Sequence, residues 1–458
     1  MSDIQGRVAG DQTYALISSY GIYDRDIHQK LFKKVPRAGA LSWMRALEGR
    51  MTKRKTRRHV YDFYEEGQFF KAAITIAGAS NTGSADSIVT LSSGDHQEAG
   101  TESYPVLNQQ VVYEDETVGF VSAKVTSVDG AHTVTITPQN DSQDVRTAGV
   151  VGGTLVFFSN AQKERSTATT GRIPKVVKVT NGIQTFREKF EVSDWESQNE
   201  VEFMYNGSKH LYVKGIDDTA DSFAIQEELG LLIGQVSDAT FHTGNDNIKT
   251  IKGLIPQITD SGNTMEYFDT PDMTTFDDAI LILNKAFGDH EYIVGQGLNV
   301  NLGLKNWLID FAQAGTGNIS FSAFQGGKEQ AISLNFKSVF IEPYSFHFQT
   351  WAILSHSDSL GAGNMPYKHM LIFIPTGKTK NPYRQEGENE YEPYLQCAYS
   401  DPQGAPFQNK GDYKLWETGA NAKSGGTSDE LTREIHFASY KGLEVRCRNR
   451  FLIARRTV

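Results

Sequence analysis

Apolar and polar residues alternate in short runs over residues 60–190, and polar, Gly-rich segments separate these runs. Alternation with a period of two is typical of strands that bury one face. The segment Asp129-Gly130-Ala131, between the runs at 123–128 and 132–137, predicts a hairpin turn. Strands are expected at 72–76, 88–91, 111–113, 120–128, 132–137 and 154–158. This block therefore predicts a small β-domain or an elaborated long loop.

The strongest helical pattern of the chain follows residue 217. Apolar residues recur at helical spacing at Ile225, Leu229, Leu232 and Val236. Acidic residues are concentrated before and within the first part of this pattern, where they suit the positive end of a helix dipole. We expect a helix from about Asp218 to about Thr240. A helix of about twenty residues spans roughly 30 Å and can brace one edge of a domain.

Helical and strand patterns are mixed in the rest of the chain. One helix should present Phe276, Ile280, Leu283 and Phe287 on one face, with Thr275 and Asp278 near its start, and a second should lie around 302–311. Further strands are expected at 176–179, 183–192, 292–294, 331–336, 339–341, 350–354, 368–374, 394–398, 431–437 and 443–453, with Asn181-Gly182 as a tight turn. Residues 376–430 are otherwise expected to be mostly loop. The mixture predicts an α+β protein.

A basic segment precedes the first predicted strand. Residues 29–58 contain eleven Lys or Arg residues and one acid, Glu48, in a chain of net charge −10. Short helices are expected at 24–31 and 41–51, and the basic run after them is expected to be loop. Since the segment has few apolar residues, we expect removal of residues 1–58 to leave the body folded. The tightest cluster of cations is Arg50, Lys53, Arg54, Lys55, Arg57 and Arg58.

Three interpretations of this basic cluster stay open. Charge runs are often solvated surface. A basic segment on an acidic chain is also attracted to the acidic surface of a neighbouring copy, or to nucleic acid. Contact with DNA lacks one supporting feature, because no aromatic residue interleaves the cluster as a base-stacking surface would need. We therefore treat the six residues as a candidate subunit-contact or DNA-contact site.

Candidate catalytic and metal-binding motifs are sparse. The sequence has no phosphate-binding loop, dinucleotide fingerprint, HExxH motif or nucleophile elbow, and its two cysteines form no CxxC pair. His347, His356 and Asp358 match no metal-ligand spacing, and Asp289-His290-Glu291 is better explained by turn and cap residues. We expect no enzyme, no cofactor, no metal site and no catalytic residue. No signal peptide or membrane span is expected either, so the chain should be made in a cytoplasm-like compartment.

The order of these parts resembles a known family. A basic helical arm opens with SSYGIYDRDIHQKLF, and a long β-excursion precedes strands with FREKFEVS. A long helix, an α/β unit containing FDDAILILNKAFGDHEYIVGQG and a return strand ending LEVRCRNRFLIARR follow. This order resembles the major capsid proteins of tailed double-stranded DNA phages with the Hong Kong 97-type fold. The arm and the β-insertion are most similar to those of crAss-like phages.

The resemblance implies a division of the chain. Residues 1–58 would be the N-terminal arm, and 59–190 the extended loop with an inserted β-domain at about 72–170. Residues 191–270 would be the peripheral domain with its spine helix, 271–380 the axial domain, and 381–458 loop and return strands to the peripheral domain.

The resemblance also implies a function. The chain would be a structural virion protein that self-assembles, as pentamers and hexamers of itself, into an icosahedral shell around double-stranded bacteriophage DNA. Portal and auxiliary or decoration capsid proteins would be further partners, DNA would be held without sequence specificity, and no membrane would be involved. The protein would be synthesised in the host bacterial cytoplasm and end in the virion capsid.

Two other functions stay open. The chain could be another virion component, such as a baseplate, tail or adhesin-type protein, that uses the β-domain for recognition. It could also be an enzyme, for instance a carbohydrate-active one, because the separation of catalytic carboxylates is a property of the fold and cannot be read from sequence.

Overall fold

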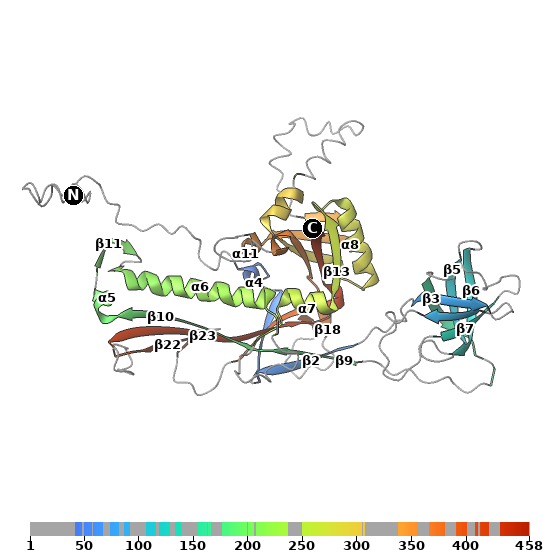
Figure 1. The fold of residues 1–458 in the computed structure, drawn as a ribbon, viewed down its shortest axis with the longest axis horizontal. Coiled ribbons are helices and arrows are strands. Elements are labelled where there is room, and N and C mark those ends of the chain that lie inside the picture. The colour runs from blue at the N-terminus through green and yellow to red at the C-terminus, as the bar shows by residue number, and fades with distance from the viewer. Residues whose placement is uncertain are drawn as a thin grey trace, which may run out of the picture. The chain divides into compact units, whose positions relative to one another are not determined.

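The computed structural model of the chain separates it into two compact units, residues 64–179 and residues 1–63 with 180–458 (Figure 1). It describes residues 42–47, 50–56, 58–66, 74–81, 87–91, 107–115, 119–128, 133–139, 154–162, 164–165, 176–198, 200–205, 208–236, 250–304, 306, 338–355, 366–380, 391–400, 408–410, 413–420 and 431–457. The described residues are mostly strands with several helices, which agrees with the expected α+β class at this coarse level.

The smaller unit contains a closed six-stranded barrel. Its strands are β3 (Ile74–Asn81), β4 (Ser87–Leu91), β5 (Gln109–Asp115), β6 (Gly119–Val128), β7 (Thr133–Pro138) and β8 (Thr154–Asn160), and they close in the order β3-β4-β7-β6-β5-β8. Alternate side chains, among them Val111, Val121, Ile136 and Leu155, fill the barrel. The predicted hairpin is confirmed, because β6 and β7 pair antiparallel. All six predicted strands of this block are present.

The larger unit contains a sheet built on one long strand. β23 (Thr432–Val445) is the centre of the order β1-β20-β23-β22-β21, and β10 (Gln184–Ser193) also pairs with it. The other members are β1 (Met51–Lys55), β20 (Leu395–Tyr399), β21 (Gln408–Lys410) and β22 (Tyr413–Thr418). The prediction of separate strands at 431–437 and 443–453 was wrong, because the chain stays extended to Val445 and re-enters a sheet only at β24 (Leu452–Thr457).

Helix α6 (Leu211–Ile233) packs on this sheet, as Figure 1 shows. Phe223 of α6 lies 6.0 Å from Phe437 of β23, measured between ring centroids. The buried carboxylate of Glu227 contacts Lys441 at 2.8 Å and Ser439 at 2.5 Å. Gly230 permits the close approach to β10, because a Cβ there would lie 2.6 Å from the Phe186 ring.

The helix was predicted with the wrong boundaries. It begins seven residues before Asp218, so the acidic residues lie inside it and none is in its first turn. It ends at Ile233, so Val236 lies beyond it. The early start follows a hairpin of β11 (Glu200–Tyr205) and β12 (Ser208–His210), which delivers the chain directly to Leu211. A single-sequence pattern does not contain that connection.

A second six-stranded sheet completes the larger unit. Its order is β13-β24-β17-β14-β16-β15, where β13 is Asn263–Phe268, β14 is Glu291–Gln296, β15 is Ser338–Ile341, β16 is Tyr344–Thr350 and β17 is Met370–Pro375. Aromatic residues from several strands and from α8 (Met273–Lys285) pack in its core. The shorter helices are α7 (Leu254–Ser261), α11 (Ala352–Ser355), η4 (Pro366–His369), η5 (Arg448–Arg450) and the described helical residues 298–304.

Several details of this region correct the sequence interpretation. Asp272, not Asp278, forms the capping box of α8 with Thr275. Phe287 does not lie on the buried face of α8, because it follows the helix and half its surface is exposed. The expected strand at 350–354 is the end of β16 followed by the single turn α11. The expected elements at 24–31 and 331–336 lie outside the described residues.

The remaining short elements also differ in part from expectation. β2 (Val60–Glu66) pairs with β9 (Val176–Gly182), so Asn181 and Gly182 end a strand and do not form the expected tight turn. β18 (Lys378–Lys380) pairs with β19 (Tyr391–Pro393) within the expected loop, and α5 (Asp194–Gln198) follows β10. Among the described residues, no helix is long and apolar enough to cross a membrane.

Candidate functional site

The basic cluster is a strand, not the expected loop. Lys53, Arg54 and Lys55 belong to β1, Arg50 directly precedes it, and Arg58 follows it; Arg57 lies outside the described residues. β1 pairs parallel with β20, with Met51 opposite Leu395 and Lys55 opposite Tyr399. It forms one edge of the sheet centred on β23. Charged residues are a common device on such edges, where they discourage unspecific strand pairing.

The segment before β1 is part of the core. The expected helix at 41–51 is reduced to the single turn α4 (Trp43–Ala46). Trp43 and Leu47 are fully buried. The Trp43 ring lies 5.6 Å from that of Trp351, and its indole N–H donates to the backbone carbonyl of Glu228 in α6 at 3.0 Å. Residues 42–47 and 50–55 therefore pack against their own chain.

The Glu228 carboxylate binds the start of this segment. It accepts hydrogen bonds from the Ser42 hydroxyl and, at 3.0 Å, from the backbone N–H of Trp43. Burial raises the pKa of the Glu228 carboxyl above its usual value, although these hydrogen bonds act in the opposite direction. Helix α6 thus supplies a cap for α4 from 185 residues away in sequence.

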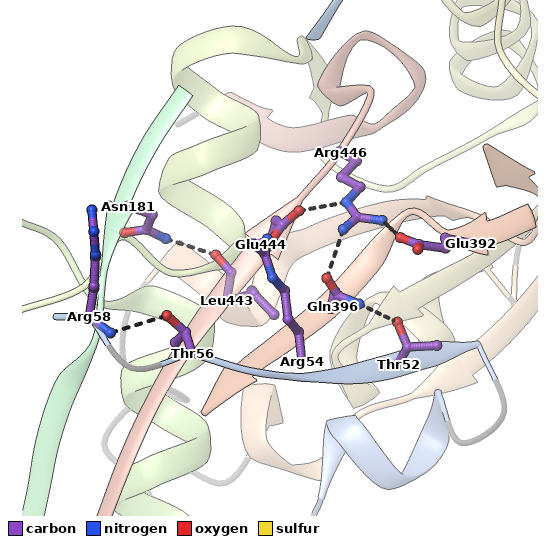
Figure 2. A network of polar contacts seen from close by, with 10 residues as sticks. All are labelled: Thr52, Arg54, Thr56, Arg58, Asn181, Glu392, Gln396, Leu443, Glu444 and Arg446. Carbon is purple, nitrogen blue, oxygen red and sulfur yellow. Dashed lines mark hydrogen bonds and ion pairs between the residues drawn. The ribbon is translucent and has the colours of Figure 1, made fainter. Parts of the chain in front are cut away.

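Arg54 enters a network of buried polar groups, which Figure 2 shows. Its guanidinium lies 3.2 Å from the carboxylate of Glu444, whose side chain is completely buried. Arg446 contacts the other Glu444 oxygen at 2.5 Å and also pairs with Glu392. Two cations and two carboxylates therefore balance one another. A buried charge needs such partners, because desolvation otherwise makes it costly.

The network joins β1, β20 and β23. Arg446 donates to Gln396 at 2.7 Å, and Gln396 donates to the Thr52 hydroxyl at 3.0 Å (Figure 2). Burial acts against the charge of Arg446, but the neighbouring carboxylates of Glu444 and Glu392 raise the pKa of its guanidinium above the ordinary value. Because every polar partner in this network has a hydrogen bond or ion pair, it fixes the register of β1.

Buried amides hold the adjacent part of β23. Asn181 donates to the carbonyl of Leu443 at 2.8 Å (Figure 2), and Gln257 donates to the same oxygen at 2.9 Å. Both side chains also donate to the carbonyl of Lys252. Tyr61 is buried beside this point, where desolvation, together with the charge of Glu444, raises the pKa of its phenol well above the ordinary value. The hydrogen bonds to Leu443 hold the backbone next to Glu444 and therefore fix the position of its side chain.

The other described cations of the cluster are exposed to solvent, as is much of the Arg54 side chain itself. Arg50 makes a long ion pair of 3.6 Å with Glu291, and both side chains are largely exposed. Lys53 and Lys55 are exposed and alternate with Arg54 along β1. Exposed ion pairs contribute little stability, so these side chains can exchange partners at little cost.

Of the weaker candidates from the sequence, the structure describes His347 and the turn Asp289–Glu291. His347 lies on β16, 3.3 Å from Glu291, whereas His356 and Asp358 lie outside the described residues. Asp289 accepts from Arg450 at 2.7 Å and from Tyr394 at 3.2 Å, which anchors the turn before β14. In the part of the chain that the structure describes, no group of three metal-ligating side chains is close enough to hold an ion.

Sequence reasoning found Arg54 but missed its partners. Glu392, Glu444 and Arg446 come from two separate regions, and each resembles an ordinary surface charge in the sequence. No local pattern distinguishes them, because their burial results from pairing between β1 and strands more than 300 residues away.

No protein-family model and no curated protein sequence matches the chain. Solved structures to which it is similar include a chain from Mycobacterium phage Cain, at 6% identity over 99% of both chains with a TM-score of 0.41. A chain from Microbacterium phage Oxtober96 is 7% identical over 98% of this chain and 100% of that one, with a TM-score of 0.43. The capsid of a native GTA particle is 7% identical over 96% of both chains, with a TM-score of 0.40.

Proposed function

We propose that the chain is a major capsid protein of a tailed bacteriophage, closest to those of crAss-like phages. Copies of it self-assemble, as pentamers and hexamers, into an icosahedral shell that encloses double-stranded DNA. The proposal takes its family from the resemblance of the sequence. Two features of the fold support it: a 23-residue helix braced on a 14-residue strand, and a barrel unit carried between β2 and β9.

Exposed aromatic side chains carry the proposal. Large aromatic residues are strongly exposed on both units, namely Trp195, Phe268, Phe340 and Phe120, with exposed fractions of 71% to 86%. Trp195, Phe268 and Phe340 belong to separate elements of the larger unit, and Phe120 to the barrel. Exposed apolar surface marks sites of association. A subunit with neighbours on several sides needs several such surfaces, whereas an enzyme needs one concave site.

The parts of the chain receive roles from this proposal. Residues 1–58 are the arm, 59–190 the extended loop with its inserted domain, 191–270 the peripheral domain, 271–380 the axial domain, and 381–458 the loop and return strands. Portal and decoration proteins are further partners, and the finished protein resides in the virion after synthesis in the host cytoplasm. The role is structural, without catalysis.

The basic cluster has two roles that an experiment can separate. If the cations grip acidic surfaces of adjacent subunits, changing Lys53, Lys55, Arg57 and Arg58 together to Gln should lower the melting temperature of empty shells, and salt should do the same to the wild type. Arg54 is left unchanged, because it pairs with Glu444 of its own chain. If they hold DNA phosphates, neither the substitutions nor salt should change the melting temperature of empty shells. DNA affinity of the isolated protein should then fall steeply with salt. We favour subunit contact, because β1 is a sheet edge on an acidic chain.

Electron microscopy of the purified protein tests the function. We expect closed icosahedral particles. Rods or rings would favour the alternative of a tail, baseplate or adhesin-type component, for which the exposed Phe120 and Phe158 of the barrel provide a recognition surface. Dispersed monomers would contradict the structural role.

A further inference from the structure

One end of the larger unit carries an exposed apolar tip. Trp195 of α5 is 78% exposed, and Leu431, just before β23, is 69% exposed. The two are neighbours, because the backbone N–H of Asp194 donates to the carbonyl of Leu431 at 3.0 Å. Figure 1 shows α5 at the end of α6 and β10. Covering this tip in an assembly would be favourable, since a packed Trp side chain buries about 150–250 Å².

The tip is acidic. We define it as residues 189–198, 417–418 and 431–434, all of which the structure describes. These ranges hold five carboxylates (Glu191, Asp194, Glu196, Glu417 and Glu434) and two cations (Lys189 and Arg433), a net charge of −3. Two tips in contact would bring like charges together, which disfavours association of the tip with itself. The partner that fits is cationic and has an apolar part.

The same chain carries a surface of that kind at the other end of its sheet. The described residues of 50–58 hold five cations and no acid. Lys53 and Lys55 are exposed on β1, and Tyr391 of β19, which precedes the strand paired with β1, is 53% exposed. Arg54 is anchored to Glu444 and keeps β1 in place beneath these side chains.

The two surfaces cannot meet within one chain. The tip adjoins Thr432 at the start of β23, and β1 reaches β23 through β20 at Leu443 and Val445. At about 3.3 Å for each residue of a strand, these points lie roughly 40 Å apart. Complementary surfaces at opposite ends of one body pair head to tail between copies, and such pairing produces rings or extended arrays.

We propose that strand β1 of one copy docks on the Trp195 tip of another copy. Lys53 and Lys55 would lie over the indole ring and between the carboxylates of the tip, and Tyr391 would add apolar contact. A cation over a Trp face is attracted by the ring, and nearby carboxylates strengthen the attraction. This inference rests on the proposed shell function and specifies one contact through which copies associate.

Cross-linking tests the pairing directly. Lys53→Cys chains and Glu196→Cys chains are mixed and treated with a short bismaleimide, and the wild type, with Cys397 buried and Cys447 half-buried, gives the background. We expect dimers that contain one chain of each kind, and about tenfold fewer of them when the second chain also carries Trp195→Ala. Dimers of Glu196→Cys chains alone in equal yield would overturn the proposal in favour of tip-to-tip contact.

A charge exchange provides the second test. Lys53→Glu with Lys55→Glu, or Glu191→Lys with Glu196→Lys, should each weaken association at least about tenfold, and combining all four changes should restore it. Failure of the combination to restore association overturns the pairing.

The outcomes separate this inference from the function. Shells of the wild type without cross-links in the mixture overturn the pairing and leave the shell function standing. Cross-links without shells keep the pairing and remove the function, and the absence of both overturns both.

Discussion

Replacement of Trp43 by Ala tests whether the segment before β1 belongs to the core. Trp43 is fully buried against Trp351 and donates its indole N–H to Glu228. Removing a buried Trp side chain costs about 3–5 kcal/mol, because the lost burial and the remaining cavity add. The lost hydrogen bond from the indole to the carbonyl of Glu228 adds about 1 kcal/mol. We therefore expect Trp43→Ala to lower the free energy of unfolding by about 5 kcal/mol.

The chain offers a matched control for this experiment. Trp195 is 78% exposed, so Trp195→Ala should change the stability of dissociated subunits by less than about 0.5 kcal/mol. Urea unfolding at low protein concentration, followed by far-UV circular dichroism, measures both variants. Equal midpoints for Trp43→Ala and the wild type would refute the argument. The burial of Trp43 and Leu47 argues against the sequence-based expectation that the body stays folded without residues 1–58, and equal midpoints would support that expectation instead.

Other predictions concern the network of Arg54, Glu444 and Arg446, the buried face of α6, and the pH dependence of stability. Glu444→Gln should cost about 3 kcal/mol, because it leaves Arg446 half-compensated in a buried site, whereas Arg54→Gln should cost about 1 kcal/mol; equal urea midpoints for the two variants would contradict this order. Leu232→Asp should prevent folding, because a charge in the core costs several kcal/mol, and a soluble variant with the wild-type melting temperature would show that Leu232 is not in the core. The raised pKa of Glu228 should make the wild type lose stability relative to Glu228→Gln as pH rises from below 4.5 through that pKa, since the folded state binds the proton more tightly. Parallel pH profiles in urea titrations would exclude this contribution.

The strands of the barrel were predictable because their signal is local. Each of its strands alternates apolar and polar residues, and inward positions such as Val111 and Ile136 follow that alternation. The hairpin of β6 and β7 could be predicted from the Gly-containing segment between them. Period-two patterning and turn chemistry suffice for the strands and for this hairpin, but not for the barrel's closure, because β4 pairs with β7 and β8 pairs with β3 and β5.

The strand β1 was not predictable for the opposite reason. Its sequence, Met51-Thr-Lys-Arg-Lys55, has one β-branched residue and three cations, so local propensity favours loop. It becomes a strand because β20, more than 340 residues later, offers a partner and Glu444 compensates Arg54. Long-range pairing overrides propensity here, and the same pairing buries charges that look exposed in the sequence.

Short apolar runs and helix ends were the other source of error. The run from Trp351 to Leu354 fits a buried strand or a buried helical turn equally well, and packing selects the turn. The acids before Glu228 suggested a helix start, but Asp217, Asp218 and Asp221 lie within α6, which starts directly after the β11–β12 hairpin. Ion pairing explains how one of these acids is accommodated inside the helix, because Lys214 binds Asp218 one turn later.

Icosahedral reconstruction of particles assembled from the purified chain is the most direct test of the central claim. The account predicts closed shells in which each subunit contributes one rod of density about 35 Å long, the length of the 23 residues of α6 at about 1.5 Å each, repeated around fivefold and sixfold positions. Particles without such repeated rods, or a chain that stays monomeric at concentrations where shells should form, would contradict it.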